Sequence, residues 1–185
     1  MCLLDDWELI MNITLGKEFE RRITEKVSDG LYTSASEVIR DGLRLLFEKD
    51  VAKNKQLEIL REEVAKGFEQ LTAGESSKHS VMDIFEQASL AVDSKSTSKN
   101  TNVFKIISTT IESWGSTQAK FYAQTIDAAL LKLAQYPDFG RERNDIYNGA
   151  RSFPVEKHIV FYQVSDNGID VARILHQRMD PSKHF

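Results

Sequence analysis

The chain has 185 residues, of which 41% are hydrophobic, and its 24 Lys+Arg and 28 Asp+Glu give a formal net charge of −4. This length allows one domain or two small ones, and two cores of that size would each be marginal alone. No apolar run approaches the roughly 18 residues of a membrane span. The single Cys2 excludes an internal disulfide and fits a reducing cytoplasm. We therefore expect a cytoplasmic protein with no membrane partner, no cofactor and no metal.

The charges are unevenly distributed along the chain. Residues 1–90 carry 12 basic and 18 acidic side chains, whereas residues 91–185 carry 12 and 10. The two halves should attract each other weakly, because salt screens surface charges. Residues 1–10 are acidic near their start and make a poor signal peptide. We expect them to form an extension, with Met11 as an alternative start.

The first structured segment is predicted to be one short strand followed by two helices. Residues 12–15 alternate polar and apolar side chains, which is typical of a strand. A helical stripe follows and should end at Asp29-Gly30. Ser34 and Glu37 have the spacing of a capping box at the start of the next helix. That helix is expected to bury Val38, Ile39, Leu43, Leu46 and Phe47.

A third helix is predicted from the apolar residues Leu57, Leu60, Val64, Phe68 and Leu71. Residues 72–101 are mostly polar and rich in Ser and Thr, which indicates a linker. Within them, residues 81–85 form a short apolar island. This island is either a helix turn of the first domain or a docking segment that folds onto a partner.

The second half is predicted to contain two helices followed by a β-hairpin, an α+β arrangement. One apolar helix face runs from Val103 to Ile111 and stops at Trp114-Gly115, and the next helix ends before Tyr136-Pro137. Alternating residues at 159–164 predict a strand covered on both faces. Residues 166–168 are a tight-turn signal, and residues 169–175 should form the return strand.

A solitary strand at 12–15 cannot satisfy its backbone hydrogen bonds, so we expect it to pair with its copy in a second chain. A two-stranded ribbon of this kind fits the major groove of DNA. Asn12 and Thr14 would then face the bases. The free N–H groups around Ser34, Ala35 and Ser36 could hold a phosphate at the start of the second helix.

Residues 13–46, ITLGKEFERRITEKVSDGLYTSASEVIRDGLRLL, resemble the ribbon-helix-helix antitoxins of the ParD family. The match is closest at Gly30-Leu31-Tyr32-Thr33-Ser34-Ala35-Ser36-Glu37-Val38-Ile39-Arg40, and the likeness covers roughly residues 12–88. The resemblance implies a mainly α, dimeric domain that binds operator DNA and represses its own transcription. It also implies that the segment after this domain clasps a toxin.

Residues 114–185 resemble the ParE-type toxins, which share the fold of the RelE ribonuclease toxins. The resemblance rests on W-G-x-x-Q-A-x-x-Y, P-x-x-G-R, Ala150-Arg151-Ser152-Phe153-Pro154 and R-I-L-H-Q-R-M-D. It implies an α+β domain with a helical hairpin on an antiparallel sheet. Toxins of this type open with a strand and then a helix motif, and the corresponding stretch here is residues 93–109. Ser, Lys and Thr stand where the strand should be and make a poor core strand, while Asn102 and Thr109 replace an acid and an aromatic residue of the helix motif. The sheet is therefore expected to lack its first strand or to hold it loosely.

The chemistry of the second half leaves two alternatives. Cleavage of RNA needs a base and cations, and the candidates are Arg151, Arg173, Arg178, His158, His176 and His184. The family resemblance instead implies a toxin without enzymatic turnover that traps DNA gyrase on cleaved DNA. Arg151, Arg173, His176 and Arg178 would then be contact or structural residues. Pairing of Arg173 and Arg178 with acids such as Asp170 and Asp180 is the structural alternative.

The complete prediction is a type II toxin–antitoxin fusion. The expected segments are an extension at 1–10, a ribbon-helix-helix domain at 11–50, a toxin-binding region at 51–90, a polar junction at 91–101 and a toxin domain at 102–185. The expected toxin-docking residues are Leu57, Leu60, Val64, Phe68, Val81, Ile84 and Phe85. The runners-up are a ribosome-dependent mRNA endoribonuclease and a decayed fusion in which only the DNA-binding half works.

Overall fold

The computed structural model describes residues 14–75, 80–91, 102–166 and 168–183. The chain divides into two structural units, residues 1–52 and residues 53–185. The helix α2, Ala35–Thr72, belongs to both of them. The segments predicted at 1–10 and at 92–101 lie outside the described residues, as do Asn12 and Ile13.

The first unit contains α1, Lys17–Ser28, and the start of α2. The predicted end of α1 is confirmed, because Gly30 has a φ of +73° and its N–H donates to the carbonyl of Val27. The predicted cap of α2 is also present, since the N–H of Glu37 donates to Ser34 Oγ at 3.3 Å. The Glu37 carboxylate binds the N–H and hydroxyl of Thr33, however, rather than the backbone of Ser34.

The two helices predicted around residues 34–47 and 57–71 are one continuous helix of 38 residues. The separation was wrong because residues 47–56, FEKDVAKNKQ, contain neither Gly nor Pro and consist largely of good helix formers. Residues 48–56 are mostly polar and interrupt the apolar spacing, but the helix backbone is continuous. One helix therefore carries both the predicted DNA-facing cap and the predicted toxin-docking stripe.

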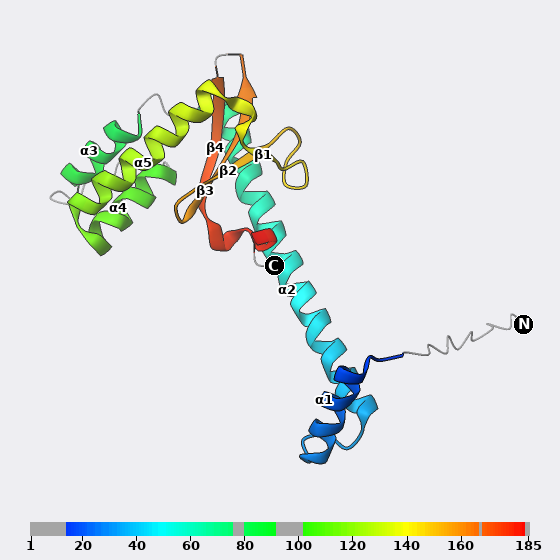
Figure 1. Cartoon of the computed structure of the whole chain (residues 1–185). Helices are drawn as coiled ribbons and strands as arrows, with labels where there is room; N and C mark the ends of the chain where they lie inside the picture. Colours follow the sequence, from blue (N-terminus) through cyan, green and yellow to red (C-terminus); the bar gives the residue numbers. More distant parts are fainter. Residues whose placement is uncertain (1–13, 76–79, 92–101, 167, 184–185) are drawn as a thin grey trace, which may run out of the picture. The chain divides into compact units, whose positions relative to one another are not determined.

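The second unit is a four-stranded antiparallel sheet covered by helices on both faces (Figure 1). Its strand order is β1-β2-β3-β4. The elements are α3 Val81–Ala91, α4 Asn102–Trp114, α5 Ser116–Gln135, β1 Arg141–Glu142, β2 Arg151–Val155, β3 His158–Ser165 and β4 Gly168–His176. Three short 3-10 turns occupy Pro137–Phe139, Gln177–Met179 and Pro181–Lys183.

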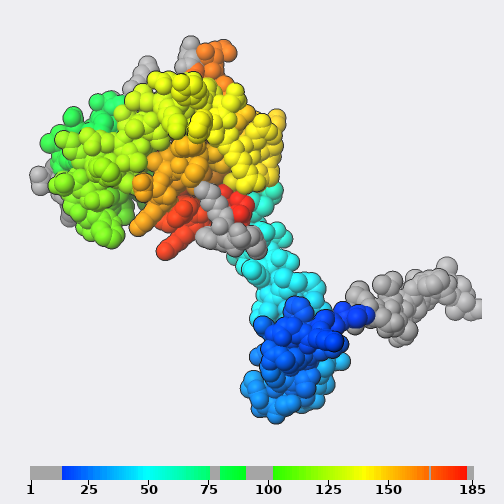
Figure 2. All heavy atoms as spheres, in the orientation of Figure 1, coloured from blue at the N-terminus to red at the C-terminus, as the bar shows by residue number. Residues whose placement is uncertain are grey.

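The α+β class, the helical hairpin and the β3–β4 hairpin agree with the prediction from sequence. Val160 and Tyr162 of β3 face α4 and α5, and Ile159 and Phe161 face α2. Both faces of this strand are therefore buried, as its continuous apolar sequence indicates. The atoms of α4, α5 and the strands form one continuous packed body in Figure 2.

The linker predicted at 72–101 needs a correction, because residues 81–91 form the helix α3. Ser80 and Asp83 cap this helix reciprocally: the N–H of Ser80 donates to Asp83 Oδ2 at 2.9 Å, and the N–H of Asp83 donates to Ser80 Oγ at 3.1 Å. The apolar face of α3 joins the core of the second unit. The capping pattern Ser80-x-x-Asp83 lies within a polar segment whose composition is typical of a linker, so the start of this helix was not predicted.

The place of the family's opening strand, in the polar residues before Asn102, lies outside the described residues, and α4 begins at Asn102. Asn102 Oδ1 accepts the N–H of Ile174 at 2.8 Å. A side chain thus satisfies a backbone group of β4 that faces away from β3. The apolar residues from Val103 to Ile111 recur at helical spacing, which explains why this segment forms a helix.

Gly67 lies where α2 packs tightly against the sheet. A Cβ atom at this position would lie 2.4 Å from the carbonyl oxygen of Ala172 in β4. Glycine inside a helix is unfavourable by about 0.5–1 kcal/mol relative to alanine, so a packing requirement explains it here. Gly42 in the same helix has open space around it.

We expect Gly67→Ala to lower the free energy of unfolding by about 1–3 kcal/mol, because the added methyl group meets a backbone carbonyl that cannot move aside. The matched variant Gly42→Ala should instead raise helix stability by about 0.5–1 kcal/mol. Urea denaturation of the full chain, followed by circular dichroism, measures both. A gain in stability for Gly67→Ala would contradict the close contact.

Candidate functional site

The C-terminal part of α2 lies with its apolar stripe against one face of the sheet. Leu60, Val64 and Phe68 are buried, and Leu57 is partly buried beside them. They pack against Ile146, Ala150, Ile159, Phe161, Ala172 and Leu175. The rings of Phe68 and Tyr147 stack with centroids 4.5 Å apart. Burial of each large apolar side chain contributes about 1.5–3 kcal/mol, so this stripe is a strong anchor.

The helix α3 lies on the opposite side of the same sheet. Val81, Ile84 and Phe85 belong to the cluster that α4 and α5 form over the sheet. Ala88 is fully buried there as well. All seven residues predicted to dock on the toxin therefore lie in the two cores of the second unit. Four of them cover one face of the sheet, and three pack among the helices that cover the other.

The DNA-binding residues predicted in the first unit are placed only in part. Thr14 is exposed and lies outside regular secondary structure, and Asn12 is outside the described residues. Ser34 is engaged as the helix cap, while Ala35 and Ser36 are exposed in the first turn of α2. The Thr33 hydrogen bonds lower the pKa of Glu37 and keep its carboxylate charged beside that turn. This charge opposes a phosphate at the same helix end.

The apolar residues that α2 was expected to bury in the first unit are solvent-exposed in the single chain. Leu43, Leu46 and Phe47 are 43%, 50% and 60% exposed, and Val38 and Ile39 are only partly covered. In the described part of this unit, α1 contributes no buried residue either. Leu43, Phe47 and Val51 line an apolar groove together with Arg40, Arg44, Glu48 and Ala52. The prediction of burial was wrong for one chain because α1 is too short to cover this face.

The four residues singled out in the toxin half do not form one cluster. Arg151 binds Asp138 and Glu142, and it also donates to the carbonyl of Gly140 at 2.8 Å. These contacts tie β2 to the turn before β1. Arg173 donates to Gln70 of α2 at 2.6 Å. Arg178 is exposed, and its backbone N–H donates to His176 Nδ1 at 3.1 Å.

The structural alternative, in which Arg173 or Arg178 pairs with Asp180, is wrong, because Asp180 pairs with Arg143. Both partners are buried, and Arg143 Nη1 lies 2.6 Å from Asp180 Oδ2. Burial would raise the pKa of Asp180, but hydrogen bonds from Arg143 and Ser182 outweigh it and lower that pKa. Asp145 supplies the second acceptor at 2.9 Å. This pair fastens the chain after β4 to the loop between β1 and β2, and no local sequence signal indicates it.

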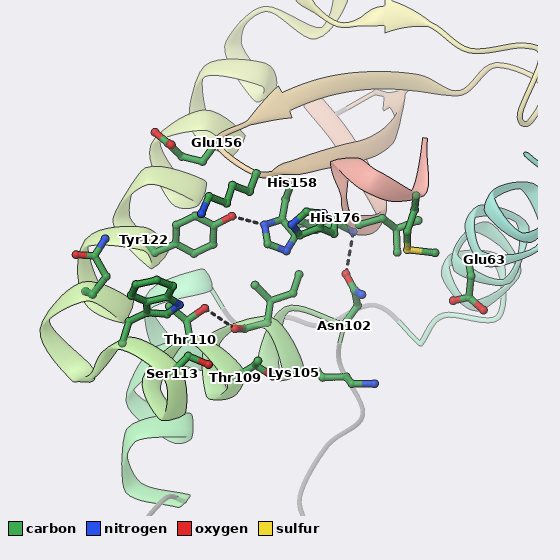
Figure 3. Close-up of a pocket in the computed structure, with 17 residues that line it drawn as sticks. Glu63, Asn102, Lys105, Thr109, Thr110, Ser113, Tyr122, Glu156, His158 and His176 are labelled. Atoms are coloured by element: carbon green, nitrogen blue, oxygen red, sulfur yellow. Dashed lines mark hydrogen bonds between the residues drawn. The ribbon is translucent and has the colours of Figure 1, made fainter. Parts of the chain in front are cut away.

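A cavity of about 710 Å³ opens where α4 and α5 meet the ends of β3 and β4 (Figure 3). Tyr122 reaches from α5 to hydrogen-bond His158 Nδ1, and His176 lies beside His158. His158 and His176 are paired across β3 and β4, with ring centroids 5.3 Å apart. Sequence reasoning named both histidines but missed Tyr122 as their partner, because the cross-strand register is not visible in one sequence.

Electrostatics keep this histidine pair neutral at pH 7. Desolvation, followed by the neighbouring His176, lowers the pKa of His158 to about 4. Burial and the nearby charges of Arg178 and Lys157 lower the pKa of His176 as well. Because the Arg178 N–H occupies Nδ1, neutral His176 carries its proton on Nε2 and is a poor metal ligand there. Among the described residues, no group of three or more His, Cys, Asp or Glu side chains could hold a metal ion.

Comparisons with known proteins assign a family to each half. The family model described as the ParE toxin of the type II toxin–antitoxin system parDE matches residues 100–181. The model described as the bacterial antitoxin of the ParD type II system and RHH matches residues 10–89.

None of the helices searched in the described residues is long and apolar enough to cross a membrane.

Individual relatives agree with both assignments. Toxin ParE1 of Mycobacterium tuberculosis (strain ATCC 25618 / H37Rv) is 38% identical over 77 residues, which are 41% of this chain and 79% of that protein. Toxin ParE1 of Caulobacter vibrioides is 32% identical over 72 residues, 39% of this chain and 74% of that protein. Antitoxin ParD of Vibrio cholerae serotype O1 is 43% identical over 51 residues, 28% of this chain and 64% of that protein.

The histidine pair should make the second unit sensitive to mild acid. A histidine whose folded pKa is lowered stabilises the fold fully above its unfolded value near 6.5, and the stability is lost as pH falls towards about 4. A shift of this size is worth about 3 kcal/mol in full, and partial solvent exposure reduces it to about 1–2 kcal/mol. Urea midpoints of the full chain at pH 7.5 and 4.5 measure the loss.

The control is His158→Gln, which removes the titrating group and keeps a polar side chain next to Tyr122. This variant should lose less stability than the parent chain between the two pH values. Equal losses in both chains would show that carboxylates, rather than His158, cause the acid sensitivity.

Proposed function

Because this chain belongs to the ParE toxin family through its C-terminal half and is a fusion of a ParD antitoxin to that toxin, we propose that it is a self-neutralised module. In this proposal the N-terminal domain binds operator DNA as a dimer and represses its own transcription. The segment formed by residues 53–91 neutralises the fused toxin domain. The toxin's target is DNA gyrase, which it traps on cleaved DNA without turnover.

The observation that carries the proposal is the position of α2 and α3. Residues 57–68 of α2 lie on one face of the toxin sheet, and α3 packs among the helices that cover the other face. The segment that corresponds to the end of an antitoxin thus occupies both sides of the toxin fold. Tethering within one chain also raises the effective concentration of this segment to around millimolar.

Dimerisation is supported by the unsatisfied apolar surface of the first unit. No residue in the described part of this unit, residues 14–52, is buried, and so small a domain is marginal alone, so Leu43, Leu46 and Phe47 require a second surface. A second copy of the same unit offers the same apolar face. The strand proposed at residues 12–15 would gain its hydrogen-bond partner in that dimer.

Separate expression of the halves tests neutralisation. Residues 92–185 induced alone should arrest growth, residues 1–91 supplied together with them should restore it, and the intact chain should be harmless. Arrest by the intact chain as strong as that by residues 92–185 would contradict neutralisation. Linear DNA formed by purified gyrase supports the gyrase target, whereas cleaved mRNA in a translation extract would replace it with ribonuclease action.

Disruption of the α2 stripe provides a second test in the full chain. Val64→Asp places a charge in the fully buried contact with the sheet and should turn the harmless chain into one that arrests growth. Ile59→Asp is the matched control, because Ile59 lies on the same helix and is 45% exposed. If Val64→Asp lowers the solubility of the chain and growth is not arrested, separate expression of the two halves tests neutralisation instead.

Thr14→Ala should weaken operator binding about 10-fold to 100-fold, since one lost base contact is worth about 1–3 kcal/mol. Binding to unrelated DNA should change little. Thr24→Ala is the matched control, because the exposed Thr24 hydroxyl donates to the carbonyl of Glu20 on its own helix. Gel-shift titration with the chain's own promoter fragment measures both variants, and equal affinity of the two would exclude Thr14 as a base contact.

A further inference from the structure

The apolar stripe of α2 cannot by itself distinguish one toxin sheet from another. Burial of Leu60, Val64 and Phe68 is non-directional and would stabilise contact with any apolar surface of similar shape. Discrimination between partners requires contacts that are lost or become repulsive on the wrong partner. Such contacts lie along the borders of the stripe.

Polar contacts made by Gln56, Arg61 and Gln70 connect α2 to the toxin domain. Gln56 donates to the backbone carbonyl of Arg178, and Arg61 Nε donates to the carbonyl of Asp145 at 2.8 Å. Arg173 Nη2 donates to Gln70 Oε1 at 2.6 Å. The first two contacts end on backbone atoms, which a toxin of any sequence offers. Among these three, only the contact between Gln70 and Arg173 depends on a side chain of the toxin domain.

Gly67 holds that side-chain contact at a fixed distance. It lies one turn before Gln70 and packs directly on the carbonyl of Ala172, the residue before Arg173. Arg173 Nη1 donates to the same carbonyl at 3.2 Å, which orients its guanidinium group along the strand. The helix therefore cannot shift to relieve an unfavourable pair at positions 70 and 173 without opening the contact at Gly67.

We propose that the pair formed by residues 70 and 173, held in register by Gly67, determines which toxin sheet α2 accepts. The pair lies at the border of a buried stripe, where a mismatch changes partner choice more than it changes the fold. A guanidinium group at 173 selects a hydrogen-bond acceptor at 70 and rejects a cation. This inference rests on the proposed neutralising role of α2.

The test uses four full-length chains: the parent, Gln70→Lys, Arg173→Glu, and the double variant. Hydrogen exchange of the amides in residues 64–72 reports how often α2 leaves the sheet. Gln70→Lys should reduce their protection about 5-fold to 10-fold, since a like-charge pair replaces a hydrogen bond at one position. Adding Arg173→Glu to Gln70→Lys should restore protection to within about 3-fold of the parent, because the charges then attract.

Glu69→Lys is the matched control. Glu69 is the exposed residue next to Gln70 on the same helix, and its substitution changes the charge by more than Gln70→Lys does. Protection of residues 64–72 should stay within about 2-fold of the parent in this variant. Equal losses for Gln70→Lys and Glu69→Lys would overturn the inference, as would a double variant no better than Gln70→Lys.

The result of the hydrogen-exchange experiment does not depend on whether residues 92–185 arrest growth. If the double variant recovers protection while residues 92–185 fail to arrest growth, the recognition pair stands and the proposed toxin function fails. If growth arrest and its neutralisation are observed but positions 70 and 173 are uncoupled, the function stands and this inference fails.

Discussion

A sheet with two apolar faces must be covered twice, and the rest of this structure depends on that requirement. Ile159 and Phe161 of β3 face one way, and Val160 and Tyr162 face the other. The helical hairpin α4–α5, joined by α3, covers the second pair. The first pair would face water without α2, because the described toxin half provides only Ile146, Tyr147, Ala150 and Met179 around that face. The C-terminal part of α2 therefore covers an apolar face that the rest of the described second unit leaves largely open.

The opposite condition holds at the other end of α2. There the helix exposes Leu43, Leu46 and Phe47, and α1 leaves them largely uncovered. The apolar side chains of this one helix are therefore buried within the chain at its C-terminal end and exposed to solvent at its N-terminal end. This difference explains why the proposed functions of the two ends differ: contact within the chain at the toxin end, and contact with a second chain at the DNA end.

Much of the second unit could be predicted because its signals are local. Helical spacing placed α4 and α5, Gly115 and Pro137 marked their ends, and alternating residues placed β3 and β4. The continuity of α2 was missed because the mostly polar residues 48–56 interrupt its apolar spacing. The partners Arg143–Asp180 and Tyr122–His158 were missed because they are 37 and 36 residues apart and depend on the fold. The sequence therefore identified residues of the site, but not the side chains that they contact.

The position of α2 ahead of the toxin domain has a consequence for the order of synthesis. A ribosome adds about 5–20 residues per second, and domains made first fold first. The stripe at residues 57–71 leaves the ribosome about one hundred residues before the end of β4, so it is complete several seconds before the sheet that it covers. The strands of the toxin domain emerge beside a helix that is already available to them. In each newly made chain, the surface proposed to neutralise therefore precedes the toxin-like sheet that it covers.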